Sequence, residues 1–274
     1  MPLVVCATPI GNLEDVTLRV LRALREADLV LCEDTRRTQV LLDRHGIRAR
    51  GLLSLHRHNE LGRAEELIPR LLAGETLAVV SDAGLPGVND PGAALLDAAL
   101  EAGIAVTVLP GASAVETALV ASGLVTAEYR FLGFLPRRDA EQHALWSEAR
   151  GWPYAAVAFE SPRRLPRSLA HLAEETPERR VAVCRELTKR YEEVVRGTAS
   201  ELAARFGEPV KGEVTLVVAP GTPDGGDPEG EAGIAAVSEL VAAGAPRRVA
   251  ADVVAGLLGA SRNALYRGSL ERGD

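Results

Sequence analysis

The feature that most constrains the fold is a regular alternation, over the first 110 residues, of short apolar runs with longer amphipathic segments. Continuous apolar strands separated by amphipathic helices are typical of a mostly parallel sheet with both faces covered. The predicted strands are Leu3–Ala7, Leu29–Cys32, Leu52–Leu55, Leu77–Val80 and Val106–Leu109. The predicted helices are Asp15–Ala27, Arg36–Arg44, Glu60–Ala73 and Pro91–Ala102.

A second series of strands follows, and its members lie closer together, which favours antiparallel or mixed pairing. We therefore expect an α/β chain with an N-terminal domain over 1–112 and a C-terminal domain over 113–222, the boundary lying near residues 111 to 125. The predicted strands are Tyr129–Leu135, Ala155–Phe159, Val181–Leu187, Glu192–Arg196 and Glu213–Ala219. The predicted helices are Ala140–Ala149, Pro166–Glu175 and Thr198–Arg205.

The last part of the chain has a different character. Residues 223–233 are rich in Pro, Gly and acidic residues and predict a linker. Three short helical patterns fill 234–274, at Ile234–Ala243, Arg247–Leu258 and Ser261–Ser269. A turn at Gly259-Ala260 and an N-cap at Ser261 give the last two a helix-turn-helix-like spacing. This small helical appendage either faces nucleic acid or packs on the body or on a partner subunit.

Composition limits the classes of protein that remain. No uncharged apolar run reaches 18 residues, and the N-terminus lacks the basic start of a signal peptide. Three widely spaced cysteines fit reduced, buried thiols in a cytoplasmic protein. The net charge of −7 argues mildly against a simple nucleic-acid binder, yet five arginines and one acid lie between Arg36 and Arg50. That stretch is equally compatible with a solvated face.

Four unusual loops leave the predicted strands: "TPIGN" (8–12), "CEDTRRT" (32–38), "SDAGLPGVNDPG" (81–92) and "PGASAVETAL" (110–119). They match neither common phosphate-binding fingerprint. Because the carboxyl ends of parallel strands share one edge, all four should lie on one rim, where ligands of open α/β sheets bind. Gly, Pro and small polar residues bring backbone groups close to a ligand, which suits a molecule with many polar edges and no phosphate chain.

Taken together, in this order and spacing, these loops resemble the tetrapyrrole methylase superfamily, whose members use S-adenosylmethionine. Within it the chain is most similar to the 16S rRNA cytidine 2′-O-methyltransferases, through stretches such as "ATPIGNLEDVTLRVLRAL", "FESPRRL", "CRELTKRYEEVVRG" and "KGEVTLVV". The resemblance covers residues 3 to about 220. It implies two α/β domains with an interdomain cleft, a homodimer, and methylation of RNA in the small ribosomal subunit. Leu85 departs from the threonine that is usual in this family.

The resemblance also implies which residues border the cofactor. Pro9 comes from the first loop, and the "SDAGLPGVNDPG" loop would wrap the methionine and ribose side, with Pro91-Gly92 starting the next helix. Ser113 has the alternative role of a plain helix N-cap, and Asp90 is interpreted as a turn or cap residue. The full predicted set is Pro9, Asp82, Ala83, Gly84, Leu85, Ser113, Ala114, Glu160, Ser161 and Gly212.

A ribose 2′-OH is a weak nucleophile, so a base or a polarising cation should assist methyl transfer. Glu33 is the first candidate because "CEDTR" leaves the second strand on the ligand rim, although it could merely pair with Arg36 or Arg37. Lys211 is the second, and it could act as a base only if burial lowered its pKa. Asp34, Glu160, Glu186 and Lys189 complete the candidates.

Arginines flank the same segments and could hold RNA phosphates as forked donors. They are Arg36, Arg37, Arg137, Arg138, Arg163 and Arg164. His56 and His58 look like a metal pair but lack a third ligand at suitable spacing, so we predict no metal site. Two alternatives stay open: a methyltransferase of the same superfamily with another acceptor, and a non-catalytic ribosome-assembly factor.

Overall fold

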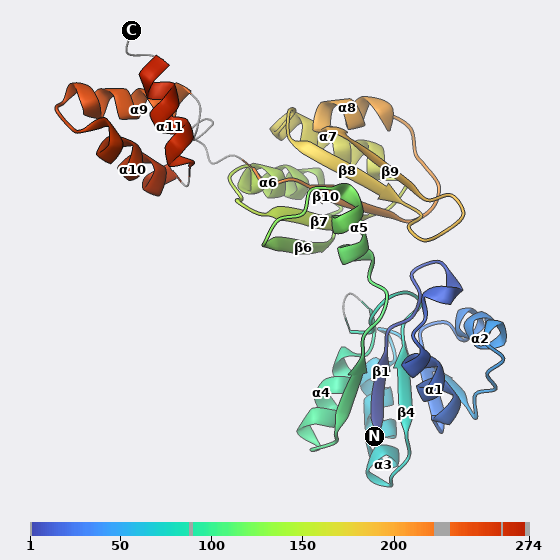
Figure 1. The fold of residues 1–274 in the computed structure, drawn as a ribbon. Helices are drawn as coiled ribbons and strands as arrows, with labels where there is room; N and C mark the ends of the chain where they lie inside the picture. The colour runs from blue at the N-terminus through green and yellow to red at the C-terminus, as the bar shows by residue number, and fades with distance from the viewer. Residues whose placement is uncertain (1, 88–89, 222–230, 259, 272–274) are drawn as a thin grey trace.

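The computed structural model describes residues 2–87, 90–221, 231–258 and 260–271. Its first lobe, which holds β1 and β4 in Figure 1, is built on a five-stranded sheet. The strand order is β3-β2-β4-β1-β5, and all pairings are parallel, as predicted. The strands are β1 (Leu3–Cys6), β2 (Leu29–Cys32), β3 (Leu52–Ser54), β4 (Leu77–Val80) and β5 (Val106–Leu109).

Helices cover both faces of this sheet. One face packs against α1 (Leu18–Glu26) and α2 (Thr35–Arg44), and the other against α3 (Glu60–Leu72) and α4 (Ala93–Glu101), each through its own buried cluster. Because β1, β2 and β4 are buried on both faces, every residue in them is apolar.

Two predicted helix starts in this lobe were wrong. Residues Leu13–Asp15 form a separate 3₁₀ turn, η1, and Thr17 N-caps α1, so that helix begins at Leu18. Helix α4 begins at Ala93 because Gly92, at φ 126°, is its N-cap and places Pro91 outside the helix. The Glu60 carboxylate accepts the N–H groups of Gly92 and Ala94 and so caps α4 from the side.

The second lobe contains a mixed sheet, as predicted, and its strand order is β6-β7-β10-β8-β9. Strands β6 and β7 are parallel, and the other pairings are antiparallel. The strands are β6 (Tyr129–Phe134), β7 (Ala155–Glu160), β8 (Arg180–Arg185), β9 (Glu193–Thr198) and β10 (Val214–Val218).

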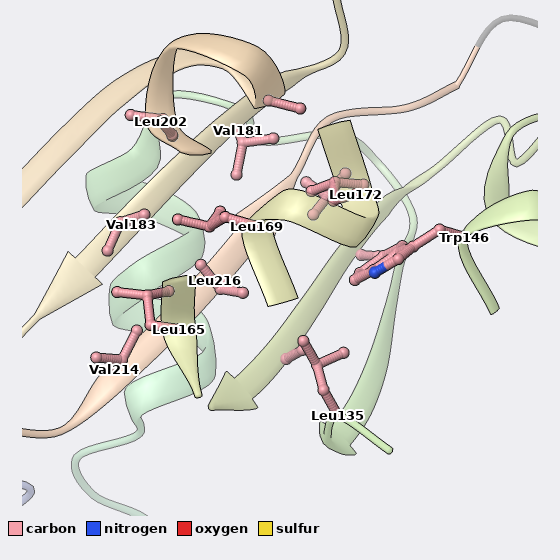
Figure 2. Packing of buried hydrophobic residues seen from close by; sticks show 14 of the residues in the cluster. Leu135, Trp146, Leu165, Leu169, Leu172, Val181, Val183, Leu202, Val214 and Leu216 are labelled. Carbon is pink, nitrogen blue, oxygen red and sulfur yellow. The ribbon is translucent and has the colours of Figure 1, made fainter. Parts of the chain in front are cut away.

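Helices α6 (Asp139–Ala149), α7 (Leu165–Glu175) and α8 (Ala199–Arg205) cover one face of this sheet, over a core that includes Trp146 and Leu169 (Figure 2). Helix α5 (Ala114–Ser122) packs on the other face against β7, β8 and β10. It lies in the region that we predicted as the domain boundary, and it belongs to the second sheet. The exact domain limits stay a prediction.

Three C-terminal helices, α9 (Glu231–Ala242), α10 (Arg247–Leu258) and α11 (Arg262–Glu271), share a small core of their own (Figure 1). Ser261 caps α11 as predicted, since its hydroxyl accepts the N–H of Ala264. Gly259 of the predicted turn and residues 222–230, which hold most of the predicted linker, lie outside the described residues. No described helix has both the length and the apolar character needed to cross a membrane.

Candidate functional site

The loops at the carboxyl edge of the first sheet meet one another. Thr8 exchanges two backbone hydrogen bonds with Gly84, and the Thr8 hydroxyl donates to the carbonyl of Ser81. The carboxylate of Asp82 accepts the N–H of Asp34. A Cβ on Gly84 would lie 3.9 Å from the carbonyl oxygen of Ala112, so the fourth loop adjoins the third. The predicted rim is therefore present.

A pocket of about 300 Å³ opens between the first loop, α2 and the loop after β4. Its polar wall holds Ser81 and Asp82, and its apolar wall holds Ile10, Leu13 and Leu41. Pro9, Asp82, Ala83 and Arg37, which the sequence analysis named, all line it. The remaining lining residues are Thr8, Gly11, Thr38, Val40 and, from the second lobe, Lys189.

The two lobes touch where the first loop meets the hairpin loop between β8 and β9. The N–H of Asn12 donates to the hydroxyl of Thr188 across 3.0 Å, and Ile10 packs in the same apolar cluster as Leu187. A Cβ on Gly11 would lie 2.5 Å from Cγ of Lys189 and 2.9 Å from the carbonyl oxygen of Leu187. Only glycine fits at position 11, because the β8–β9 loop lies so close to it. Gly11 and Lys189, which meet at this contact, both line the pocket.

A cluster of acidic groups lies at the rim of the first lobe. Burial, and then repulsion by Asp82, raises the pKa of the half-buried Glu33 carboxyl above its usual range. Burial, and then repulsion by Glu33, raises the pKa of Asp90 to about 6. Arg37 offsets part of this charge through a 2.9 Å ion pair with Asp82. A carboxylate with a raised pKa is a stronger base near neutral pH than an ordinary surface carboxylate.

Arg36 and Arg37 pair with Asp34 and Asp82, and not with Glu33. The interpretation of Glu33 as a simple partner of these arginines therefore loses its support. Asp90, which we interpreted as a turn or cap residue, also faces this acidic cluster.

A second cluster comes from the other lobe. The Lys189 ammonium lies 2.9 Å from a carboxylate oxygen of Glu186 and 2.9 Å from one of Glu213. The hydrogen bond from Lys189 holds the pKa of Glu186 below its usual range, and the two carboxylates raise the pKa of Lys189 against the opposing effect of burial. Lys189 therefore acts as a donor and is a poor base.

Glu160 is a deeply buried member of the predicted site residues. Its carboxylate is buried at the end of β7, where it accepts the Ser168 hydroxyl and the Ser161 N–H and pairs with Arg164 at 2.6 Å. Arg164 also donates to the carbonyls of Leu135 and Pro136. All these contacts lie within the second lobe, so the roles of Glu160 in cofactor binding and of Arg164 in RNA binding stay predictions.

The other predicted residues are distributed around the rim. The Ser113 hydroxyl donates to Glu116 in the first turn of α5, and Ala114 packs in the apolar cluster beneath that helix. Gly212, at φ 93°, lies against Glu186, beside an exposed Lys211. Leu85 is partly buried, Arg137 and Arg163 are exposed, and Arg138 pairs with Glu141. Their functional roles also stay predictions.

Several residues of the site escaped the sequence analysis. Thr38, Val40 and Leu41 line the pocket only because α2 begins directly after "CED" and turns one face toward it. Thr188 meets the first lobe because its backbone is left-handed, at φ 65°, and nothing in the sequence indicates that conformation for a β-branched residue. Gly11 could have been predicted as a site residue, because it lies in the "TPIGN" loop.

His56 and His58 stack edge to face with their ring centroids 6.0 Å apart. Over the described ranges, no three His, Cys, Asp or Glu side chains are grouped so that they could hold a metal ion. Cys6, Cys32 and Cys184 are free and buried.

Comparison with known proteins identifies the family to which this chain belongs. The family model for Tetrapyrrole (Corrin/Porphyrin) Methylases matches residues 2–203. The chain belongs to the tetrapyrrole methylase family. It is 42% identical over 271 residues to a protein from Mesorhizobium japonicum named "Ribosomal RNA small subunit methyltransferase I", covering 98% of this chain and 91% of the relative. A protein of the same name from Halalkalibacterium halodurans is 46% identical over 213 residues, covering 77% of this chain and 73% of the relative.

Solved structures of tetrapyrrole methylases share the fold. The methyltransferase CobJ aligns with a TM-score of 0.62 at 21% identity, covering 81% of this chain and 95% of the other. Uroporphyrin-III C-methyl transferase from Thermus thermophilus, solved with S-adenosyl homocysteine, aligns with a TM-score of 0.55 at 17% identity, covering 80% and 97%. Both alignments support the arrangement of the two sheets described above.

Proposed function

We propose that this chain is an S-adenosylmethionine-dependent methyltransferase that methylates the ribose 2′-OH of a cytidine in the 16S rRNA of the small ribosomal subunit. The observation that carries the proposal is the 42% identity over nearly the whole chain to a relative named for small-subunit ribosomal RNA methylation. We further propose that it works in the cytoplasm as a homodimer, as the family resemblance implies.

The residues at the rim fit the cofactor. A pocket of about 300 Å³ is at the small end of the usual range for small-molecule sites, and it combines an apolar wall with the carboxylate of Asp82. The left-handed Gly84 (φ 78°) points its carbonyl at the N–H of Thr8, and this bends the loop after β4 around the rim. A ligand with many polar edges suits these loops, because their backbone groups come close to the pocket.

When bound, S-adenosylmethionine supplies a methyl group on a sulfonium, ready for in-line displacement. Pro9, Ala83 and the backbone of the neighbouring loops would hold it, and Asp82 would face its positive charge. Glu33 would accept the proton of the ribose hydroxyl, because its raised pKa favours proton uptake. Lys189 would donate a hydrogen bond from the second lobe, and the close contact at Gly11 would exclude water.

The experiment is transfer of a tritiated methyl group from S-adenosylmethionine to unmethylated small ribosomal subunits. Nuclease digestion and mass spectrometry should then find 2′-O-methylcytidine at one position of the 16S rRNA. Transfer to a porphyrinogen in place of RNA would show another methyl acceptor. No transfer to either substrate, with the cofactor bound, would favour a non-catalytic assembly factor.

A further inference from the structure

The loop between β8 and β9, residues 186–192, forms one wall of an open hollow beside the pocket. This side hollow, of about 410 Å³, is lined by Asn12, Glu14, Arg44, Thr188, Lys189 and Arg190, together with Gly11 and Leu13. Gly11, Leu13 and Lys189 line the pocket as well. A ligand that enters the pocket therefore has a direct continuation into the side hollow.

The loop is held in one conformation. Glu186 and Thr188 both have left-handed backbones, at φ 52° and 65°, although neither is glycine. Thr188 is fixed on two sides, because its hydroxyl accepts the N–H of Asn12 and its own N–H donates to Glu192 across 2.6 Å. Strained residues persist where the surrounding contacts fix them, and they cluster at ligand sites. These contacts therefore hold the backbone that carries Arg190 and Tyr191.

Two of the cationic side chains around the side hollow have acidic partners among the described residues, and the third does not. Lys189 is bound by Glu186 and Glu213, and Arg44 pairs with Glu14. Arg190 makes no ion pair with any carboxylate in the described part of the chain. Its guanidinium lies 5.6 Å from the ring centroid of Tyr191, which is 66% exposed.

An arginine without an acidic partner beside an exposed aromatic ring suits the binding of single-stranded RNA. The guanidinium neutralises a phosphate, and the ring offers a face on which an unpaired base can stack. We propose that the RNA strand next to the target nucleotide runs through the side hollow, with a phosphate on Arg190, and continues onto the adjacent Tyr191 ring, where a neighbouring base stacks. This inference rests on the proposed function, because it assumes an RNA substrate, and it specifies where that RNA continues.

The test uses the full chain with unmethylated small ribosomal subunits. Filter retention measures subunit binding, and single-turnover transfer of tritiated methyl measures the reaction at increasing subunit concentration. Tyr191→Ala should weaken subunit affinity about tenfold, and Tyr191→Phe should stay near wild type because the ring remains. Arg190→Ser should lower the slope of log affinity against log salt by about one. The transfer rate at saturating subunits should not change.

The control is Arg25→Ser in the last turn of α1, which removes one exposed charge with no contact to either hollow. Thermal unfolding and calorimetry with S-adenosylmethionine should be unchanged in all variants. Unaltered subunit affinity in Tyr191→Ala would overturn the inference. A changed sedimentation coefficient of Tyr191→Ala with normal subunit affinity would also overturn it, since the surface around Tyr191 would then be an interface between two copies of the chain. Tyr191-dependent binding without methyl transfer would overturn the proposed function and support the inference.

Discussion

The two ionisable clusters at the site come from different lobes and have opposite chemistry. In the first lobe, Glu33 and Asp90 have raised pKa values because burial, and then repulsion by neighbouring carboxylates, disfavours their charges. In the second, Glu186 has a lowered pKa and Lys189 a raised one, because each is held by a partner of opposite charge. One lobe thus provides groups that can take up a proton, and the other provides groups that hold their charges.

This difference follows from the two sheets. All strands of the first sheet are parallel, so every loop at their carboxyl ends reaches the same rim, and acidic side chains crowd there. The second sheet is largely antiparallel, so the loops between its strands lie at both ends of the strands. The β8–β9 hairpin loop is the part of this lobe that reaches the pocket, through Lys189. There Lys189 from this loop pairs with Glu186 and with Glu213, which directly precedes β10.

The largest expected effect comes from removing the proposed proton acceptor, Glu33. Glu33→Gln keeps the shape of the side chain and removes its basicity, so single-turnover methyl transfer at saturating cofactor should fall at least about 100-fold, the usual contribution of a general base. Calorimetry should show unchanged affinity for S-adenosylmethionine.

Glu26→Gln, at the exposed end of α1, is the matched control and should leave the rate unchanged. An unchanged rate in Glu33→Gln would remove this residue from the mechanism and leave the first cluster without a catalytic role.

The next largest effect is expected at the contact between the two lobes. Gly11→Ala places a methyl group 2.9 Å from the backbone carbonyl of Leu187, which cannot move away as a flexible side chain could. We expect about 1–3 kcal/mol of destabilisation, seen as a lower unfolding temperature, together with weaker cofactor binding.

Gly62→Ala provides the contrast for this substitution. It lies inside α3, where a new Cβ meets nothing within 4 Å, and it should raise the unfolding temperature. Equal behaviour of the two variants would mean that the lobes are not held by this contact.

A smaller effect is expected at the second cluster. Lys189→Met leaves Glu186 and Glu213 without their cation, so the negative charge beside the side hollow increases and subunit affinity should fall several-fold at low salt. The ion pairs are partly exposed, so stability should change by less than about 1 kcal/mol. Filter retention in low and high salt checks this, because screening should shrink the difference at high salt.

The sequence predicted the fold to within a few residues because buried strands and amphipathic helices have distinct periods. Thus β2 and β4 appear within the predicted limits. It also predicted that Pro9, Asp82 and Ala83 belong to one rim. It could not predict that Thr188 bonds to Asn12, because the two are 176 residues apart and Thr188 needs an unfavourable backbone. Nor could it find Asp90 in the acidic cluster, since the pKa of a carboxyl depends on neighbours brought close only by folding.

The smallest expected effect is on the pH dependence of stability, through Asp90 of the acidic cluster. The folded-state pKa of Asp90, about 6, lies above its usual value of 3.8, so the folded chain holds a proton that the unfolded chain releases between these pH values. Stability contributed by this group is therefore lost as pH rises from about 4 to about 6. Asp90→Asn keeps a polar side chain that cannot ionise, so its advantage in unfolding temperature over wild type should grow from pH 4 to pH 7.

The same variant should lower the pKa of Glu33, because one repelling charge is gone, and so shift the pH dependence of the methyl transfer that we propose Glu33 to assist. Thermal unfolding at each pH and the pH dependence of single-turnover rates measure the two effects independently. A stability advantage that shrank with rising pH would mean that Asp90 is paired in the folded chain. The two clusters would then be alike in chemistry, and the division of roles between the lobes would be wrong.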